Sequence, residues 1–345
     1  MAKDKVISFQ LLRVFAAVLV FTSHCDELVQ FSNDYKLMFF GCAGVSLFLT
    51  LSGFLSAFTY ENDAQMTSCQ LIKKRWKQFF NIHFLTLLIA VPLFVDSYAN
   101  EPVIWSMRFV ANLSLIQAFF PSASFYFSFN GVAWYLSMVL FMAMVTPITV
   151  KILKRISIRT AVIILVAVAV IEHVLSFLFS SSEIMQWIVY VFPVVRYLDF
   201  LGGGAVYKLA VFIKEKRMYT FNKLICGISF VFIIVTGIVS VFEGNCNLYS
   251  ATWLIPSQLL VMSSYNIKIT CREHSLINKC IMCFTSISLE FFMIQQLVIR
   301  YYVRCYENRM IPVFLECILI FAVSVAAAVL LHQITSKNGI VRTTA

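Results

Sequence analysis

The sequence predicts an all-α integral membrane protein with about ten transmembrane helices and both termini in the cytoplasm. Hydrophobic residues make up 60% of the 345-residue chain and charged residues only 13%, whereas soluble domains average about 45–50% and about 25%. Mean hydropathy is +0.85. The apolar runs reach about 20 residues, the length at which a helix crosses a bilayer. A β-barrel would instead show alternating segments of about ten residues.

Ten apolar runs follow one another along the chain. The first follows a charged start, but Arg13 interrupts it and no small-residue cleavage site follows, so a retained helix is expected rather than a signal peptide. The eighth is the weakest because it holds Pro256. The short run Phe109–Phe120 is expected to be re-entrant or interfacial, with an eleven-span arrangement as the alternative. The predicted spans are Val6–Ser23, Met38–Phe58, Phe79–Val95, Gly131–Val150, Ala161–Phe179, Trp187–Tyr207, Leu224–Phe242, Ala251–Ile267, Ile281–Ile299 and Val313–His332.

The positive charges are distributed unevenly between the loops that these spans define. With the N-terminus inside, 20 of the 27 lysines and arginines lie on inner segments and five on outer segments. This asymmetry follows the positive-inside rule, so the net charge of +10 is attributed to topology and not to a nucleic-acid partner. No repeat or flexible linker is visible. Residues 1–345 are therefore expected to form a single domain in the cytoplasmic (inner) membrane, with no appended soluble domain.

The ten cysteines predict neither a disulfide framework nor a metal site. They are scattered mostly through the predicted spans, where cysteine behaves as a small buried apolar residue. Cys280 and Cys283 form a lone CxxC pair with no second pair and no histidine, which is too little for zinc. No metal is expected.

Arg13 and His24 are the two residues of the first span that most strongly indicate function. Eleven residues at about 100° each leave only about 20° after three turns, so both side chains lie on one helix face. They are about 16 Å apart along the axis, which excludes direct contact. A buried arginine needs an anionic or water-lined partner. Histidine titrates near operating pH and suits a general base, although a histidine at a helix end is also often merely interfacial.

Two further stretches have both a structural and a functional interpretation. Gly41–Leu55 is rich in small residues, which let helices approach closely. Lys73–His83 opens the third span with four cations in five positions. Topology alone explains such a cluster, but it is also suited to bind a polyanion such as a phosphate group.

In this order the stretches resemble acyltransferase family 3, a family of polytopic membrane proteins. The resemblance begins with the Arg-x10-His spacing, the stretch GVSLFLTLSGF and the basic cluster, and it spans residues 10–300. It continues through NLSL (Asn112–Leu115), GVAWYLSMVLF (Gly131–Phe141) and SISLEFFMIQQLVI (Ser286–Ile299). The resemblance implies ten helices, an acyl donor taken from the cytoplasm, typically acetyl-CoA, and an acceptor hydroxyl outside, usually on an envelope glycan.

The resemblance also implies roles for individual residues. His24 matches the family's proposed essential histidine, and Arg13 matches its arginine partner. The basic pair of the family's inner loop corresponds to Lys74 and Arg75. Together with Lys77, these side chains are the candidate binding site for the phosphates of the acyl donor.

The chain departs from the family pattern at four positions. Gln78 stands where the inner motif has its second arginine, and Asn81 where a proline follows. Val139 replaces a frequent glutamate, and Gln295 replaces a histidine of the penultimate helix. Trp134 and Ser137, from the motif that contains Val139, are candidates for the acceptor side.

The remaining ionisable residues within the predicted spans need partners. Arg196 and Asp199 are three residues apart and are expected to pair with each other. Glu172 and Glu290 are candidate supporting residues for the base or the channel, and Arg13 or channel water is a partner that would suit Glu290.

The predicted function is an O-acyltransferase that moves an acyl group, expected to be acetyl, from acyl-CoA to a surface polysaccharide or its lipid-linked precursor. Direct transfer with His24 as general base is favoured over a covalent acyl-enzyme. A non-catalytic polysaccharide export protein of the same ancestry is the alternative. An ion-coupled transporter ranks third, because no paired broken helices are visible. The oligomeric state is not predicted.

Overall fold

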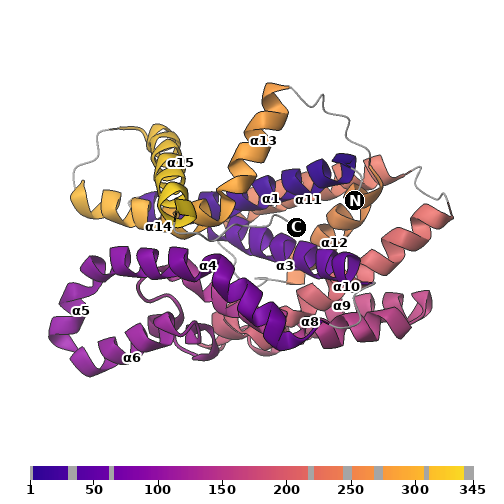
Figure 1. Cartoon of the computed structure of the whole chain (residues 1–345), viewed down its shortest axis with the longest axis horizontal. Helices are drawn as coiled ribbons and strands as arrows, with labels where there is room; N and C mark the ends of the chain where they lie inside the picture. The colour runs from indigo at the N-terminus through magenta and orange to yellow at the C-terminus, as the bar shows by residue number, and fades with distance from the viewer. Residues whose placement is uncertain are drawn as a thin grey trace.

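The computed structural model describes residues 3–29, 37–61, 66–216, 221–243, 251–267, 275–306 and 311–337, and these residues form helices with no strand among them (Figure 1). The α-helices are α1 (Lys3–His24), α2 (Asp26–Val29), α3 (Met38–Tyr60), α4 (Ser68–Ala90), α5 (Val95–Asn100), α6 (Pro102–Leu113), α7 (Ala123–Tyr126), α8 (Trp134–Arg155), α9 (Ile158–Leu178), α10 (Pro193–Glu215), α11 (Asn222–Glu243), α12 (Ala251–Asn266), α13 (Leu276–Ser286), α14 (Ser288–Cys305) and α15 (Val313–Lys337). Short 3₁₀ segments η1 (Val91–Phe94), η2 (Gln117–Phe119) and η3 (Gly131–Ala133) and a π-helical turn η4 (Trp187–Val191) complete the described structure.

Side-chain hydrogen bonds cap the starts of three helices, α4, α9 and α13. Thr67 caps α4 in a capping box, in which its hydroxyl accepts from the amide of Gln70 and the Gln70 side chain accepts from the amide of Thr67. Ser157 and Ser275 accept from backbone amides at the starts of α9 and α13. These caps place the basic stretch of α4 inside the first turns of a regular helix.

Among the described residues, seven helices are long and apolar enough to cross a membrane, or eight if the bent pair of α13 and α14 counts as one span. The protein is therefore a multi-pass membrane protein. The other two predicted spans correspond to α10 and α12. The first carries the ion pair Arg196–Asp199 in its first two turns, and the second has only 16 residues. Both are buried against other helices. The ten-span count and the cytoplasmic termini stay predictions.

The core of the molecule is the contact between α3 and α10, which also brings α1, α9 and α12 together. The small residues of both helices make this contact close. A Cβ atom built on Gly53 would overlap the carbonyl oxygen of Phe200, and one built on Gly203 would overlap that of Thr50. Glycine is required at both positions because backbone meets backbone there. The structural interpretation of the small residues in α3 is confirmed for Gly53.

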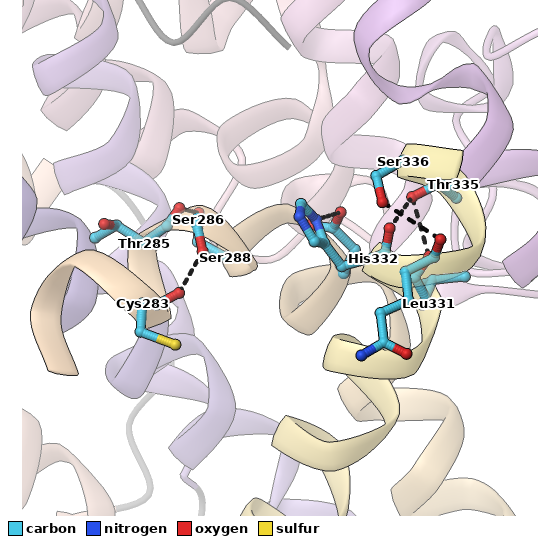
Figure 2. Close-up of polar contacts among 10 residues, drawn as sticks. Cys283, Thr285, Ser286, Ser288, Leu331, His332, Thr335 and Ser336 are labelled. Atoms are coloured by element: carbon cyan, nitrogen blue, oxygen red, sulfur yellow. Dashed lines mark hydrogen bonds and ion pairs between the residues drawn. The ribbon is translucent and has the colours of Figure 1, made fainter. Parts of the chain in front are cut away.

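The ninth predicted span, Ile281–Ile299, is not one straight helix. It breaks at Ile287 into α13 and α14, which meet at 71°. Figure 2 shows the serine side chains at the break: the Ser286 hydroxyl donates to the carbonyl of Cys283 at 2.6 Å, and the Ser288 hydroxyl donates to that of Thr285 at 2.9 Å. Hydroxyls that bond to nearby carbonyls compete with the helical ladder and favour a bend. The expectation of a single continuous helix was wrong for this reason.

The stretch Phe109–Phe120, expected to be re-entrant or interfacial, forms the end of α6 and the 3₁₀ segment η2, and α6 itself belongs to a helical hairpin. Helices α5 and α6 fold against each other at one end of the molecule (Figure 1). The NLSL stretch ends this hairpin: the Asn112 amide donates to the carbonyl of Arg108 and to the Ser128 hydroxyl, and Leu115 adopts a left-handed backbone with φ 55°. This motif therefore shapes a turn.

Candidate active site

A cavity of roughly 700 Å³ lies between α1, α3, α4, α8 and α13. Helices from all three thirds of the chain form its walls, so no short segment of sequence contains it. Hydroxyl and amide side chains give the wall its polar character. They are Gln10, Ser52, Ser56, Thr59, Tyr60, Gln78, Tyr135, Thr146, Thr285 and Ser286.

Three cations belong to the wall of this cavity: Arg13, Lys74 and Arg75. Arg13 donates from Nη1 to Gln10 Oε1 at 3.2 Å and lies close enough to Arg75 to repel it electrostatically. Arg75 donates from Nη1 to Gln78 Oε1 at 3.1 Å. Lys74 and Arg75 on α4 are exposed, while Arg13 is half-buried. Cations that form no ion pair with the described residues and gather at one cavity suit a ligand with several negative charges.

Tyr135 lies on the cavity wall deeper among the helices. Its side chain hydrogen-bonds with Ser52 on α3, and it interacts electrostatically with both Arg13 and Arg75. Val139 follows one turn later on α8 and also lines the cavity. Two of the four departures from the family pattern, Gln78 and Val139, are therefore in this one cavity, where each replaces a charged side chain by a neutral one.

His24 ends the continuous helix that also carries Arg13, as the spacing requires. Its side chain is half-buried, and its Nδ1 atom is buried without a hydrogen-bond partner among the described residues. Arg13 lines the cavity, but His24 does not. The arginine and the histidine thus mark two separate places along α1.

The other predicted site residues fall outside the cavity. Lys77 is exposed on α4 and is not a wall residue. Trp134 is buried and packs on Tyr190, with ring centroids 4.9 Å apart. Ser137 donates to Gln117 Oε1 at 3.0 Å. Neither acceptor-side candidate lines the cavity, whereas their neighbour Tyr135 does.

Glu172 belongs to a buried ionic network at the contact of α3, α9 and α10. The predicted pair is confirmed: Arg196 Nη1 and Asp199 Oδ2 are 3.1 Å apart, and both side chains are almost fully buried. Asp199 also accepts from the Ser46 hydroxyl and hydrogen-bonds with Glu172. Asp199 therefore joins the three helices, and Glu172 is part of this network.

Glu290 forms a second buried pair, with a partner that the sequence did not suggest. His332 Nδ1 on α15 lies 2.8 Å from Glu290 Oε1 on α14, and Figure 2 shows the imidazole beside the start of α14. The glutamate is fully buried, whereas the histidine side chain is 31% exposed. Farther along α14, Gln295 is fully buried, and neither of its amide atoms has a hydrogen-bond partner among the described residues.

Sequence reasoning missed Tyr135, His332 and the contact between α2 and α14 described below. The signal for Tyr135 was present, because it lies inside the motif that begins at Gly131. His332 is separated from Glu290 by 42 residues and by a loop, so no spacing rule connects the two side chains.

Comparison with known proteins identifies the family. An acyltransferase domain family matches residues 6–333. The chain is also similar to the acyltransferase MdmB of Streptomyces mycarofaciens, with 26% identity over 213 residues, which are 56% of this chain and 54% of that protein. The chain thus spans about half the length of this relative. No solved structure matches the chain.

The match covers nearly every described helix, from α1 through most of α15, and includes both the cavity and His24. Family membership implies an acyl donor and an acceptor that meet in a membrane protein. The chain is a membrane protein of acyltransferase family 3.

Proposed function

We propose that the protein is an inner-membrane O-acyltransferase that moves an acetyl group from cytoplasmic acetyl-CoA to a hydroxyl of a surface polysaccharide or its lipid-linked precursor. The observation that carries the proposal is the grouping of Arg13, Lys74 and Arg75 on one cavity, with Arg13 on the helix that ends in His24. The cations are suited to the phosphates of the donor, and the histidine is suited to the acceptor.

The chemistry follows from the length of α1. A donor whose phosphates contact Lys74 and Arg75 has its thioester at the far end of a long arm, which passes Arg13. The acceptor oxygen attacks the thioester carbonyl carbon while His24 takes the hydroxyl proton. The carbon–sulfur bond then breaks, and the departing thiolate takes the proton that His24 accepted, which restores the neutral imidazole. Arg13 and His24 are about 16 Å apart along the helix, so Arg13 acts on the donor arm and not on the base.

Replacement of the histidine tests this proposal. His24→Ala is expected to abolish acetylation of the surface polysaccharide while the protein still inserts in the membrane, measured by mass spectrometry of the polysaccharide and by membrane fractionation. His173→Ala is the matched control, because His173 is exposed and bonds only its own helix, to the carbonyl of Ala169. Full acetylation by the His24→Ala protein would refute the proposed base.

A non-catalytic polysaccharide export protein is the second candidate. The neutral side chains of Gln78 and Val139 in the cavity favour it, because both replace charged residues of the family pattern. In that case loss of the gene removes polysaccharide from the surface without changing the acetyl content of the polysaccharide that remains. The same mass spectra, with the amount of surface polysaccharide, distinguish the two functions.

A further inference from the structure

Glu27, Gln296 and Arg300 form a polar cluster, here called the Glu27 cluster, between α2 and α14. Gln296 Nε2 donates to Glu27 Oε1 at 2.9 Å, and Arg300 Nε donates to the same oxygen at 3.3 Å. The two donors are four residues apart on α14 and so lie on one helix face. The cluster is separate from the cation-lined cavity, because none of its members lines that cavity.

The Glu27 cluster lies beside His24. Glu27 follows the histidine by three residues, and the Arg300 guanidinium interacts electrostatically with the imidazole. Arg300 Nη1 also donates to the carbonyl of Phe129 at 2.9 Å, and Phe129 has a left-handed backbone with φ 54°. A Cβ built on Gly131 would lie 2.7 Å from Gln296 Oε1. The turn from Phe129 to Gly131 is thus held against the cluster.

The cluster still has polar atoms that face a ligand. Both hydrogen bonds from described residues reach Oε1 of Glu27, and the glutamate side chain is 29% exposed, so within the described part of the chain Oε2 is the oxygen left for a ligand. His24 Nδ1 and Gln296 Oε1 are buried and have no hydrogen-bond partner among the described residues. Buried polar atoms are normally satisfied, so each of these two atoms is expected to bond to a hydroxyl-bearing molecule or to water.

From this arrangement we infer that the Glu27 cluster binds the acceptor beside His24, with Glu27 Oε2 accepting a hydrogen bond from a sugar hydroxyl next to the one that reacts. Arg300 is a positioning residue: it fixes the Glu27 carboxylate and the turn at Phe129. The inference rests on the proposed function and extends it to the acceptor.

The charge balance of the cluster indicates which part of the acceptor it takes. The negative charge of Glu27 is compensated by Arg300 at 3.3 Å, and the arginine's bonds are directed to the protein. A carboxylate with one open oxygen accepts from hydroxyl groups, but the oxygens of an ionised phosphate or uronate have no hydrogen to donate to it. The ligand at this position is therefore an uncharged sugar ring.

Kinetics with purified protein in lipid nanodiscs test the inference, with radiolabelled acetyl-CoA as donor and polysaccharide from a strain lacking the gene as acceptor. Glu27→Gln and Arg300→Gln are each expected to raise the KM for the polysaccharide by about tenfold or more, the effect of losing a hydrogen bond to a charged group. The KM for acetyl-CoA stays unchanged. Gly131→Ala crowds Gln296 without removing a charge, and it is also expected to raise the KM for the polysaccharide.

The matched controls are Arg304→Gln and Asp96→Asn. Arg304, one turn beyond Arg300 on α14, and Asp96 on α5 form an exposed ion pair at 3.5 Å, and their loss is expected to change neither KM. Folded Glu27→Gln and Arg300→Gln proteins with an unchanged KM for the polysaccharide would overturn the inference, and so would an equal change in the KM for acetyl-CoA.

If the wild-type protein transfers no acetyl group, the proposed function fails on its own. Binding of the same polysaccharide to wild-type and Glu27→Gln nanodiscs without acetyl-CoA then still tests the Glu27 cluster. Equal binding by the two proteins would overturn it.

Discussion

Arg196 and Asp199 form a buried ion pair, and the pair is stable in the protein interior only when both partners are present. Each side chain is at most 1% exposed, and Asp199 also bonds with Ser46 and Glu172. Taking two charges out of water is costly, and their attraction offsets that cost only while the geometry is intact. The pair therefore makes the contact of α3, α9 and α10 specific, and one unpartnered charge would weaken it.

Asp199→Ala is expected to lower the free energy of unfolding by about 3–5 kcal/mol, because it leaves the buried Arg196 without its partner. Adding Arg196→Met should recover part of this loss. Thermal unfolding in detergent measures both effects. Arg304→Ala, which breaks an exposed pair, should cost about 0–1 kcal/mol. An Asp199→Ala protein as stable as wild type would contradict the account.

Individual residues differed in how far the sequence determined their surroundings. The pairing of Arg196 with Asp199 was predictable because both lie on one helix three residues apart. The bonds that Asp199 makes with Ser46 and Glu172 were not, since they join three helices far apart in the chain. The same holds for the candidate site: Arg13, Lys74 and Arg75 were identified by pattern, whereas Tyr135 entered the site only through packing.

Helices α3 and α10 depend on glycine for their contact, whereas Gly227 of α11 has open space around it. Gly203→Ala is expected to reduce stability, because its Cβ would overlap the backbone of Thr50 and the helices would have to separate. Overpacking of this kind typically costs about 1–3 kcal/mol. The matched control is Gly227→Ala on α11, where nothing lies within 4 Å of the added Cβ.

The control variant should be neutral or slightly stabilising, since alanine is favoured over glycine inside a helix by about 1 kcal/mol. Thermal unfolding of the two variants side by side checks the pair. Equal midpoints would mean that α3 and α10 can move apart at little cost, which is the opposite of what the backbone contacts imply.

Hydropathy predicted where helices lie better than where they break. Every predicted span corresponds to a helix or a pair of helices. The bend at Ile287 escaped prediction because serines inside an apolar run leave its hydropathy high while their hydroxyls bond to the backbone. Helices α10 and α12 were predicted correctly as helices, but neither meets the length and composition of a membrane-crossing helix. The first carries a buried ion pair, and the second has only 16 residues.

The whole molecule has a predicted orientation that two of its own cysteines can report. Cys69 lies at the start of α4 and Cys305 at the end of α14, and both are exposed. The distribution of lysine and arginine places the first inside and the second outside. In intact cells a membrane-impermeant maleimide should therefore label Cys305 and not Cys69.

Single-cysteine variants, with the other nine cysteines replaced by serine, make this measurement unambiguous. Permeabilised cells provide the control, because both thiols should then react. Labelling of Cys69 alone in intact cells would invert the orientation and would move the cation-lined cavity to the outer side.

Helix α1 is unbroken from Lys3 to His24, and this continuity makes it a molecular ruler. A helix holds the separation and the relative angle of two side chains because each residue adds a fixed rise of about 1.5 Å and a turn of about 100°. Arg13 and His24 therefore move together when α1 tilts or slides. One residue inserted between them would rotate the histidine by about 100° and turn it away from the helix face that carries the arginine. The bilayer sets how long the helix must be, but the distance between these two side chains is set by the count of residues between them.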